Sequence, residues 1–347
     1  MAEPTLAVEG LRTHFFARHG VVRAVDGVSF DLAAGEILAI VGESGCGKSV
    51  TALTLMGLTR GQNTDITGEV RFGERELVGA TDSELLGVRG AEMAMIFQNP
   101  MTSLDPVYRV GDQIAEQIRV HEDVTAAEAR ARSIELLDRV GIPHPESRVD
   151  AYPHEFSGGM RQRVMIAMAL SCSPRVLIAD EPTTALDVTV QAQILERVLD
   201  LRRDEDAGII LITHDLGVVA EVADRVAVMY AGRVVEQGSL DEIFYDPTHP
   251  YTWGLLGSVT RLDRDHAGRL PSIAGAPPSL ISPPPGCHFR PRCPHAFGKC
   301  EQAPPLEQRD PDSPGHLDRC WLDLESKRSR RQVRGGIGLE TTEEAPA

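Results

Sequence analysis

The sequence feature that most constrains the fold is the stretch from Gly42 to Ser49, which reads GESGCGKS. The pattern G-x-x-x-x-G-K-S is typical of a loop that binds phosphate groups between a buried strand and a helix. An apolar run that ends in β-branched residues precedes it at 36–41, and apolar side chains at helical spacing follow it at 50–58. The motif therefore stands in the strand–loop–helix context that its chemistry requires.

This phosphate-binding loop has the groups that a nucleoside triphosphate needs. Glycines let backbone N–H groups curl around a phosphate, and the start of the following helix adds unpaired N–H donors and partial positive charge. We expect Lys48 to reach the β- and γ-phosphates and the Ser49 hydroxyl to ligate Mg²⁺. A chance match is expected in roughly one chain in a hundred of this length. The predicted ATP-binding residues of the loop are Gly42, Ser44, Gly45, Cys46, Gly47, Lys48, Ser49 and Val50.

Size and charge limit the possible classes of protein. The chain has 347 residues, enough for two domains, and its 42% hydrophobic and 25% charged residues are ordinary for a globular protein. A net charge of −16 argues against nucleic acid as the main partner. The N-terminus lacks a signal pattern and no apolar stretch approaches the length of a spanning helix, so we expect a cytosolic chain that another subunit holds at any membrane.

Polar groups follow three further apolar runs, each predicted to be a buried strand. These are Gln98 after 93–97, Asp180 and Glu181 after 176–179, and His214 after 208–213. In α/β sheets ligands bind beyond the carboxyl ends of the strands. We expect Asp180 to hold the Mg²⁺ shell and Glu181 to orient and polarise an attacking water, while Gln98 senses the metal or the water. A lone histidine is more often structural, but as the third such strand end His214 is predicted to be functional.

The regions around these strands also show patterns. Residues 5–41 predict antiparallel strands before the phosphate-binding loop, with Phe15 and Phe16 in a loop between them, where an aromatic ring either stacks on adenine or joins the core. Residues 107–170 carry helical periodicity and predict a helical insertion, with Thr125 and Glu128 as a capping box. The insertion closes on FSGGM at 156–160, either a second anion-binding helix end or an ordinary capped helix.

Taken in order, these motifs resemble the nucleotide-binding subunits of ABC transporters over about residues 5–245. The phosphate-binding loop matches Walker A, and Asp180 and Glu181 match the end of Walker B. Residues 156–160 match the signature LSGGQ, and residues 185–187 match the D-loop. Gln98 matches the glutamine of the Q-loop, and His214 matches the switch histidine. Phe156 and Met160 depart from the signature, while Ser157, Gly158 and Gly159 are intact.

The resemblance implies an ATPase with an α/β fold of the ABC type: a RecA-like core with an antiparallel β subdomain and a helical insertion. Two such domains would stack head to tail, so that the signature residues Ser157, Gly158 and Gly159 of one chain bind the ATP held by the other. The implied roles are Glu181 and His214 as catalytic residues, Phe15 as the adenine-stacking residue with Phe16 as its alternative, and Ser49, Gln98 and Asp180 at Mg²⁺.

Three stretches narrow the subfamily. Residues 98–106, 249–252 and 286–294 resemble segments of the peptide and nickel importers, and the last is similar to the "D" ATPase subunits of dipeptide and oligopeptide permeases. The resemblance implies a peripheral subunit on the cytoplasmic face of the membrane. Its partners would be a second homologous ATPase, two membrane-spanning permease subunits and an extracytoplasmic binding protein. A nickel importer is the alternative, and an ABC ATPase that does not transport is a less favoured one.

Four cysteines cluster near the end of the chain, at 287, 293, 300 and 320. Clustered cysteines in a reducing compartment suggest a metal site, yet the spacing matches neither common structural zinc sites nor ferredoxin runs, and free thiols are the alternative. The resemblance to permease ATPases implies that Cys287, Cys293, Cys300 and Cys320 hold a structural [4Fe–4S] cluster, with Zn²⁺ as the alternative. We expect an ABC ATPase domain at 5–245, a small cysteine-rich C-terminal lobe within an extension at 246–326, and a disordered tail at 327–347.

Overall fold

The fold is described from a computed structural model. It covers residues 4–99, 103–182, 206–258 and 273–331, together with the pairs 191–192, 195–196, 199–200 and 202–203.

Within these residues, eight strands form the main sheet, in the order β11-β12-β10-β9-β3-β8-β7-β6. Strands β9, β3, β8, β7 and β6 are parallel, whereas β10, β12 and β11 add antiparallel pairs at one edge. The bounds are β3 Ile37–Val41, β6 Met93–Ile96, β7 Val176–Asp180, β8 Gly208–Ile212, β9 Arg225–Tyr230, β10 Arg233–Ser239, β11 Glu307–Gln308 and β12 Leu317–Asp318. The order brings the ends of β3, β8, β7 and β6 side by side.

A second, antiparallel sheet has the order β2-β1-β4-β5 among the described strands. Its bounds are β1 Leu6–Ala17, β2 Gly20–Leu32, β4 Thr64–Phe72 and β5 Arg75–Glu76. Phe15 and Phe16 lie within β1, paired with Val22 and Val21 of β2, so the prediction of a loop at these residues is wrong. The strands continue because only a short turn separates β1 from β2.

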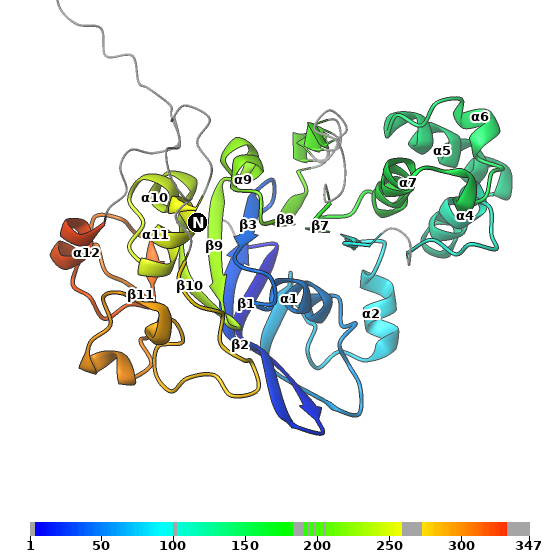
Figure 1. The fold of residues 1–347 in the computed structure, drawn as a ribbon. Helices are drawn as coiled ribbons and strands as arrows, with labels where there is room; N and C mark the ends of the chain where they lie inside the picture. The colour runs from blue at the N-terminus through cyan, green and yellow to red at the C-terminus, as the bar shows by residue number, and fades with distance from the viewer. Residues whose placement is uncertain are drawn as a thin grey trace, which may run out of the picture.

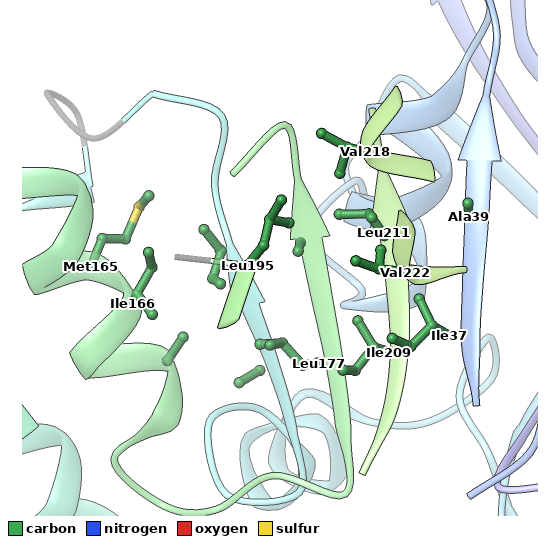
Figure 2. Packing of buried hydrophobic residues seen from close by; sticks show 14 of the residues in the cluster. Ile37, Ala39, Met165, Ile166, Leu177, Leu195, Ile209, Leu211, Val218 and Val222 are labelled. Atoms are coloured by element: carbon green, nitrogen blue, oxygen red, sulfur yellow. The ribbon is translucent and has the colours of Figure 1, made fainter. Parts of the chain in front are cut away.

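Helices cover the parallel strands. Figure 2 shows Val218 and Val222 of α9 beside Leu211 of β8, and Met165 and Ile166 of α7 further to the left, beyond Leu195. Strands β3, β7 and β8 are buried throughout, which explains why their sequences are continuously apolar. The helices that accompany the two sheets are α1 Lys48–Leu55, α2 Asp82–Val88 and α9 Leu216–Val222.

Among the described residues between β6 and β7, four helices and a 3₁₀ turn form a group, and Figure 1 shows them to one side of the parallel strands, away from α1. They are α4 Val110–His121, α5 Ala126–Arg139, α6 Pro145–Arg148, η1 Pro153–Glu155 and α7 Gly158–Leu170. The predicted capping box is confirmed: the Thr125 side chain accepts from the Glu128 N–H, and the Glu128 carboxylate accepts from the Thr125 N–H at 2.8 Å. Such a cap contributes about 1 kcal/mol to the helix that it begins.

The C-terminal residues join the main sheet. After β10 come α10 Leu240–Tyr245, α11 Pro250–Gly257, the 3₁₀ turns η2 Arg290–Arg292 and η3 Gly298–Glu301, β11, β12 and α12 Leu324–Arg330. Because β12 pairs with β10, this segment extends the sheet rather than forming the separate lobe that was predicted. The predicted tail at 327–347 also begins too early, since Lys327 is buried within α12.

Buried polar contacts connect this segment to β10, and we call the residues that make them the C-terminal polar network: Glu236, Thr248, His316, Asp318 and Lys327. His316 Nε2 lies 2.8 Å from Glu236 Oε1, and Lys327 Nζ donates to Asp318 Oδ2 at 2.6 Å. The Thr248 hydroxyl lies 3.0 Å from Glu236 Oε1 and 2.9 Å from Asp318 Oδ2. All five residues are buried, so each charge needs the partner that it has here.

Candidate nucleotide-binding site

The phosphate-binding loop connects β3 to α1 in a conformation that only glycine tolerates at two positions. Gly42 and Gly47 have φ values of 153° and 106°. A Cβ at Gly42 would lie 2.2 Å from the Met229 carbonyl oxygen, and one at Gly47 would lie 2.2 Å from that of Ala24. The loop is therefore packed against β9 and β2, which fixes the direction of its N–H groups before any ligand arrives.

Lys48 and Ser49 begin α1 and point back toward the loop and the sheet. Lys48 Nζ donates to the carbonyl oxygens of Gly42 at 2.7 Å and Glu43 at 3.1 Å. The Ser49 hydroxyl donates to Asp180 Oδ1 at 3.1 Å, which joins the loop to the end of β7. Cys46 is buried beside Lys48, and burial raises the pKa of its thiol although the Lys48 charge opposes this. These contacts hold a hydroxyl and a carboxylate side by side, a ligand pair that suits Mg²⁺.

Asp180 is the last residue of β7 and is buried, with 3% of its surface exposed. Burial raises the pKa of this carboxyl and the charge of Glu181 raises it further, although the Ser49 hydroxyl and the Lys48 charge act in the opposite direction. Two adjacent carboxylates thus gather negative charge at the end of a buried strand. A cation bound there would relieve that repulsion.

Glu181 joins the ends of three neighbouring strands. Gln98 Nε2 donates to Glu181 Oε2 at 3.1 Å, and His214 Nδ1 lies 3.3 Å from Glu181 Oε1. The backbone of Glu181 has a φ of +48°, rare for a residue with a side chain, and its N–H donates to the Ile212 carbonyl at 2.8 Å. The strained turn aims the carboxylate between Gln98 and His214, and strain of this kind is found at functional sites. We call Gln98, Asp180, Glu181 and His214 the strand-end cluster.

The predicted signature residues lie elsewhere in the chain. Ser157 caps α7 by accepting from the Met160 N–H at 3.3 Å, and Phe156 is buried at the base of this helix. Figure 1 places α7 with α4, α5 and α6, apart from α1. Gln162 of α7 donates to the Pro182 carbonyl at 2.9 Å and so connects this helix to the residue after Glu181. The predicted D-loop at 185–187, like residues 100–102, lies outside the described residues.

The predicted adenine-stacking residue lies in the antiparallel sheet. Phe15 is partly buried, whereas Phe16 has 53% of its surface exposed. Both belong to β1, whose Thr13 lies 2.9 Å from Thr54 of α1 through their hydroxyl oxygens. The sheet that carries both phenylalanines therefore contacts the helix that begins at the phosphate-binding loop.

Sequence reasoning missed one contact to the loop. Arg292 pairs with the Glu43 carboxylate at 2.6 Å and 3.0 Å, and the Tyr251 hydroxyl accepts from the Glu43 N–H at 2.9 Å. The available signal was Glu43 itself, because a carboxylate inside a loop that binds anions calls for a positive partner. Nothing in the sequence identified that partner among the chain's arginines.

The four C-terminal cysteines line one cavity. Its walls also include Phe289, Phe297, Trp321 and Leu322. Burial raises the pKa of Cys293 to about 11 and that of Cys320 to about 12. Within the described part of the chain, no three His, Cys, Asp or Glu side chains are grouped as a metal ion would need. The predicted metal site is therefore not confirmed.

Family models match two parts of the chain. The model described as "ABC transporter" matches residues 25–184, which include the phosphate-binding loop and the end of β7. The model described as "Oligopeptide/dipeptide transporter, C-terminal region" matches residues 235–300.

Curated relatives resemble the chain over nearly its whole length. The dipeptide transport ATP-binding protein DppD of Bacillus subtilis is 52% identical over 335 residues, which cover 96% of this chain and 98% of the relative. The oligopeptide transport ATP-binding protein OppD of Salmonella typhimurium is 52% identical over 324 residues, covering 93% and 95%. Among solved structures, cbiO1 from Clostridium perfringens matches with a TM-score of 0.58 at 28% identity and covers 71% of this chain and 92% of that one.

The fold and the strand-end cluster define an ATPase of the ABC type, which couples ATP hydrolysis to transport. The matches then identify the branch: the chain belongs to the family of dipeptide and oligopeptide transport ATP-binding proteins.

Proposed function

We propose that this chain is the ATP-hydrolysing subunit of an ABC importer of dipeptides or oligopeptides. The observation that carries the proposal is the strand-end cluster, in which Gln98 and His214 contact Glu181 from the two neighbouring strand ends, next to the phosphate-binding loop. The peptide substrate rests on relatives named for dipeptide and oligopeptide transport. Nickel remains the competing cargo.

Each residue has a proposed role in hydrolysis. The N–H groups of the phosphate-binding loop and Lys48 bind the phosphates, and Phe15 stacks on adenine. Ser49, Asp180 and Gln98 hold Mg²⁺, whose charge would offset that of the phosphates. Glu181 accepts a proton from the attacking water, and His214 orients the carboxylate from the other side. The exposed position of His214, with 66% of its side chain accessible, leaves it free to meet the γ-phosphate.

The proposed assembly needs two such ATPases. Ser157, Gly158 and Gly159 stand at the start of α7, away from α1, so each chain would offer its signature to the ATP of a homologous partner. No helix among the described residues could cross a membrane. We propose that two permease subunits hold the pair at the cytoplasmic face and that an extracytoplasmic binding protein delivers the peptide.

We also propose the domain division and the metal group. Residues 5–245 act as the ATPase domain, with 107–170 as its helical insertion, and 246–326 act as the C-terminal extension. Cys287, Cys293, Cys300 and Cys320, which line one cavity, would hold a [4Fe–4S] cluster, with Zn²⁺ as the alternative. Its contribution would be to hold the segment together.

The metal proposal has a direct test. Protein purified without oxygen is expected to be brown and to contain about four irons per chain. Cys293→Ser should bleach it. Colourless protein with one zinc per chain would indicate a zinc site instead of the cluster. Metal-free protein would indicate that the four cysteines are free thiols.

The transport proposal is tested with the whole complex in vesicles. The chain alone should hydrolyse ATP slowly, and the permease subunits with the partner ATPase and binding protein should raise the rate and allow uptake of a labelled dipeptide. Lys48→Ala should abolish uptake because it removes the charge that faces the phosphates. Full ATPase activity of the isolated chain, with no effect of the permease subunits, would reject the transport function; uptake of nickel but not of peptide would change the cargo.

A further inference from the structure

The phosphate-binding loop contains a carboxylate whose partner lies near the other end of the chain. Arg292 Nη1 donates to Glu43 Oε2 at 2.6 Å and Nη2 donates to Oε1 at 3.0 Å. Only 4% of the Arg292 side chain is exposed, against 27% for Glu43. Two parallel bonds between planar groups fix both the distance and the orientation of the carboxylate.

The guanidinium is itself held in place on its other sides. Arg292 Nε donates to the Ala274 carbonyl at 2.9 Å, and Nη2 donates to that of Ile273 at 3.1 Å. Nη1 also donates to the Tyr230 hydroxyl at 3.4 Å. Because these contacts use the remaining donors, Arg292 arrives at Glu43 in a single preset orientation, which an unsupported surface arginine would lack.

A tyrosine holds the backbone of the same loop residue. The Tyr251 hydroxyl accepts from the Glu43 N–H at 2.9 Å, and Tyr251 is fully buried. Its ring packs against Tyr230 at 4.6 Å and Phe289 at 5.5 Å between centroids. Phe289 and Arg292 belong to one turn, so the segment that carries Cys287 and Cys293 also holds the loop.

Electrostatics gives this contact a consequence for nucleotide binding. Glu43 is in the loop that would surround a triphosphate, and Lys48 already donates to the Glu43 carbonyl. An unpaired carboxylate at this position would repel the phosphates, whereas a paired one adds little net charge. Among the described residues, Arg292 is the cation that pairs with the Glu43 carboxylate, and it does so through two hydrogen bonds.

We infer that Arg292 is a positioning residue for the nucleotide site: it neutralises Glu43 and turns its carboxylate toward the C-terminal segment, and so sets the affinity of the loop for MgATP. The inference rests on the proposed ATP site. It makes the C-terminal segment a determinant of nucleotide affinity although that segment provides no ligand to the phosphates.

The test measures MgATP binding to the full chain by calorimetry, in a Glu181→Gln background that blocks turnover. Arg292→Met is expected to raise the Kd for MgATP about tenfold, within the usual range of coupling between sites. Adding Glu43→Gln should restore most of the affinity, because the carboxylate that Arg292 neutralised is then gone. A purely structural loss would not be repaired by a second substitution. The effect of Arg292→Met should also shrink as salt increases.

Arg319→Met is the matched control. Arg319 is a partly buried arginine of the same segment that donates to the Val234 and Gly27 carbonyls at 2.8 Å and 3.1 Å instead of to Glu43. The Arg319→Met variant should have a lower melting temperature and an unchanged Kd for MgATP. If Arg292→Met does not fold, Glu43→Gln alone decides the question, since it should bind MgATP at least as tightly as the parent.

Three outcomes would overturn the inference: wild-type affinity in Arg292→Met, no restoration in the double variant, or weaker binding in Glu43→Gln alone. A different result would reject the proposed ATP site itself. In that case the parent protein would not bind MgATP, and Lys48→Ala would make no difference.

Discussion

The strand-end cluster and the C-terminal polar network both place carboxylates in or near the protein interior, but they balance the charge differently. In the C-terminal polar network, Glu236 faces His316 and Asp318 faces Lys327, so each carboxylate has a cation, although burial and the charge of Glu236 still raise the pKa of Asp318. In the strand-end cluster, Asp180 and Glu181 are adjacent in sequence, and the repulsion between them raises the pKa of Asp180 beyond the effect of burial.

The difference separates a structural arrangement from a functional one. A network in which each carboxylate faces its own cation is complete and contributes to folding. A cluster of like charges, held on a strained backbone with an exposed histidine, keeps a repulsion that Lys48 and Ser49 offset in part and that a bound cation would relieve further. The comparison predicts that substitutions in the strand-end cluster change the rate of ATP hydrolysis, while substitutions in the C-terminal polar network change the stability of the fold.

The largest expected effect is on chemistry. Glu181→Gln keeps the shape of the side chain and removes the base, which should lower kcat of the assembled transporter by about 10²–10⁴-fold. The melting temperature should stay within a few degrees of the parent, since no ion pair of the C-terminal polar network is touched. Turnover measurements and a thermal melt on the same sample test both statements, and near-normal turnover would remove Glu181 as the base.

The next effect is on stability. Lys327→Met removes the cation that hydrogen-bonds to the buried Asp318 and leaves Arg309 Nε at 3.9 Å, a change that typically costs about 3–5 kcal/mol and would lower the melting temperature by about 5–15 °C. The turnover per folded molecule should remain close to the parent value. An unchanged melting temperature of Lys327→Met, or a lower turnover of the folded variant, would contradict the structural role of the C-terminal polar network.

A smaller effect concerns pH. Burial opposes the charge of His316, but the hydrogen bond and charge of Glu236 outweigh it and raise the pKa of His316. Burial likewise opposes the charge of Glu236, yet His316 and nearby donors hold the pKa of Glu236 below its ordinary value. Glu242 and Asp318 also raise the pKa of His316.

The signs define the pH window. A raised histidine pKa stabilises the fold fully below about pH 6.5, its ordinary pKa, and the gain is lost as pH rises through the folded value. A lowered glutamate pKa stabilises the fold above about pH 4.5, and that gain is lost as pH falls through its folded value. The difference in melting temperature between the parent and His316→Gln should therefore be largest between about pH 5 and 6 and shrink as the pH rises above that range. A constant difference would contradict the assigned charges.

The smallest expected effect lies outside both regions, at the contact between Tyr251 and the phosphate-binding loop. Tyr251→Phe removes the acceptor for the Glu43 N–H, a loss of about 1 kcal/mol that should raise the Kd for MgATP about fivefold with kcat unchanged. Phe16→Ala, on the exposed face of β1, serves as the control for general disturbance of aromatic residues near the site and tests the alternative adenine contact at the same time. Calorimetric binding separates the two, because loss of stacking should weaken ATP more than inorganic triphosphate, whereas Tyr251→Phe should weaken both.

Sequence patterns were sufficient where local structure decides the outcome. The strand-end cluster follows buried strands whose apolar runs are visible in the sequence, and the parallel order then brings Gln98, Glu181 and His214 together. The Thr125 cap was also predictable, since both of its partners lie within four residues.

Contacts between distant segments could not be predicted. Glu43 and Arg292 are 249 positions apart, and neither carries a local pattern that identifies the other. Strand β12 has two residues, too few for alternation, and it forms because β10 offers an unpaired edge. The buried position of Lys327 was missed for the same reason, because its basic neighbours suggested a solvated tail and its carboxylate partner at Asp318 is reached only in the folded chain.

The pairing of β12 with β10 has a consequence for the order in which the chain is made. Leu317 and Asp318 leave the ribosome well after Ser239, a delay of roughly 5–15 s at about 5–20 residues per second. During that interval the edge of β10 is open and Glu236 has no His316 beside it. A nascent chain at this stage exposes a strand edge that can pair with another polypeptide. Prematurely released chains should therefore be prominent clients of chaperones and proteases, and only completion of the C-terminal segment ends that exposure.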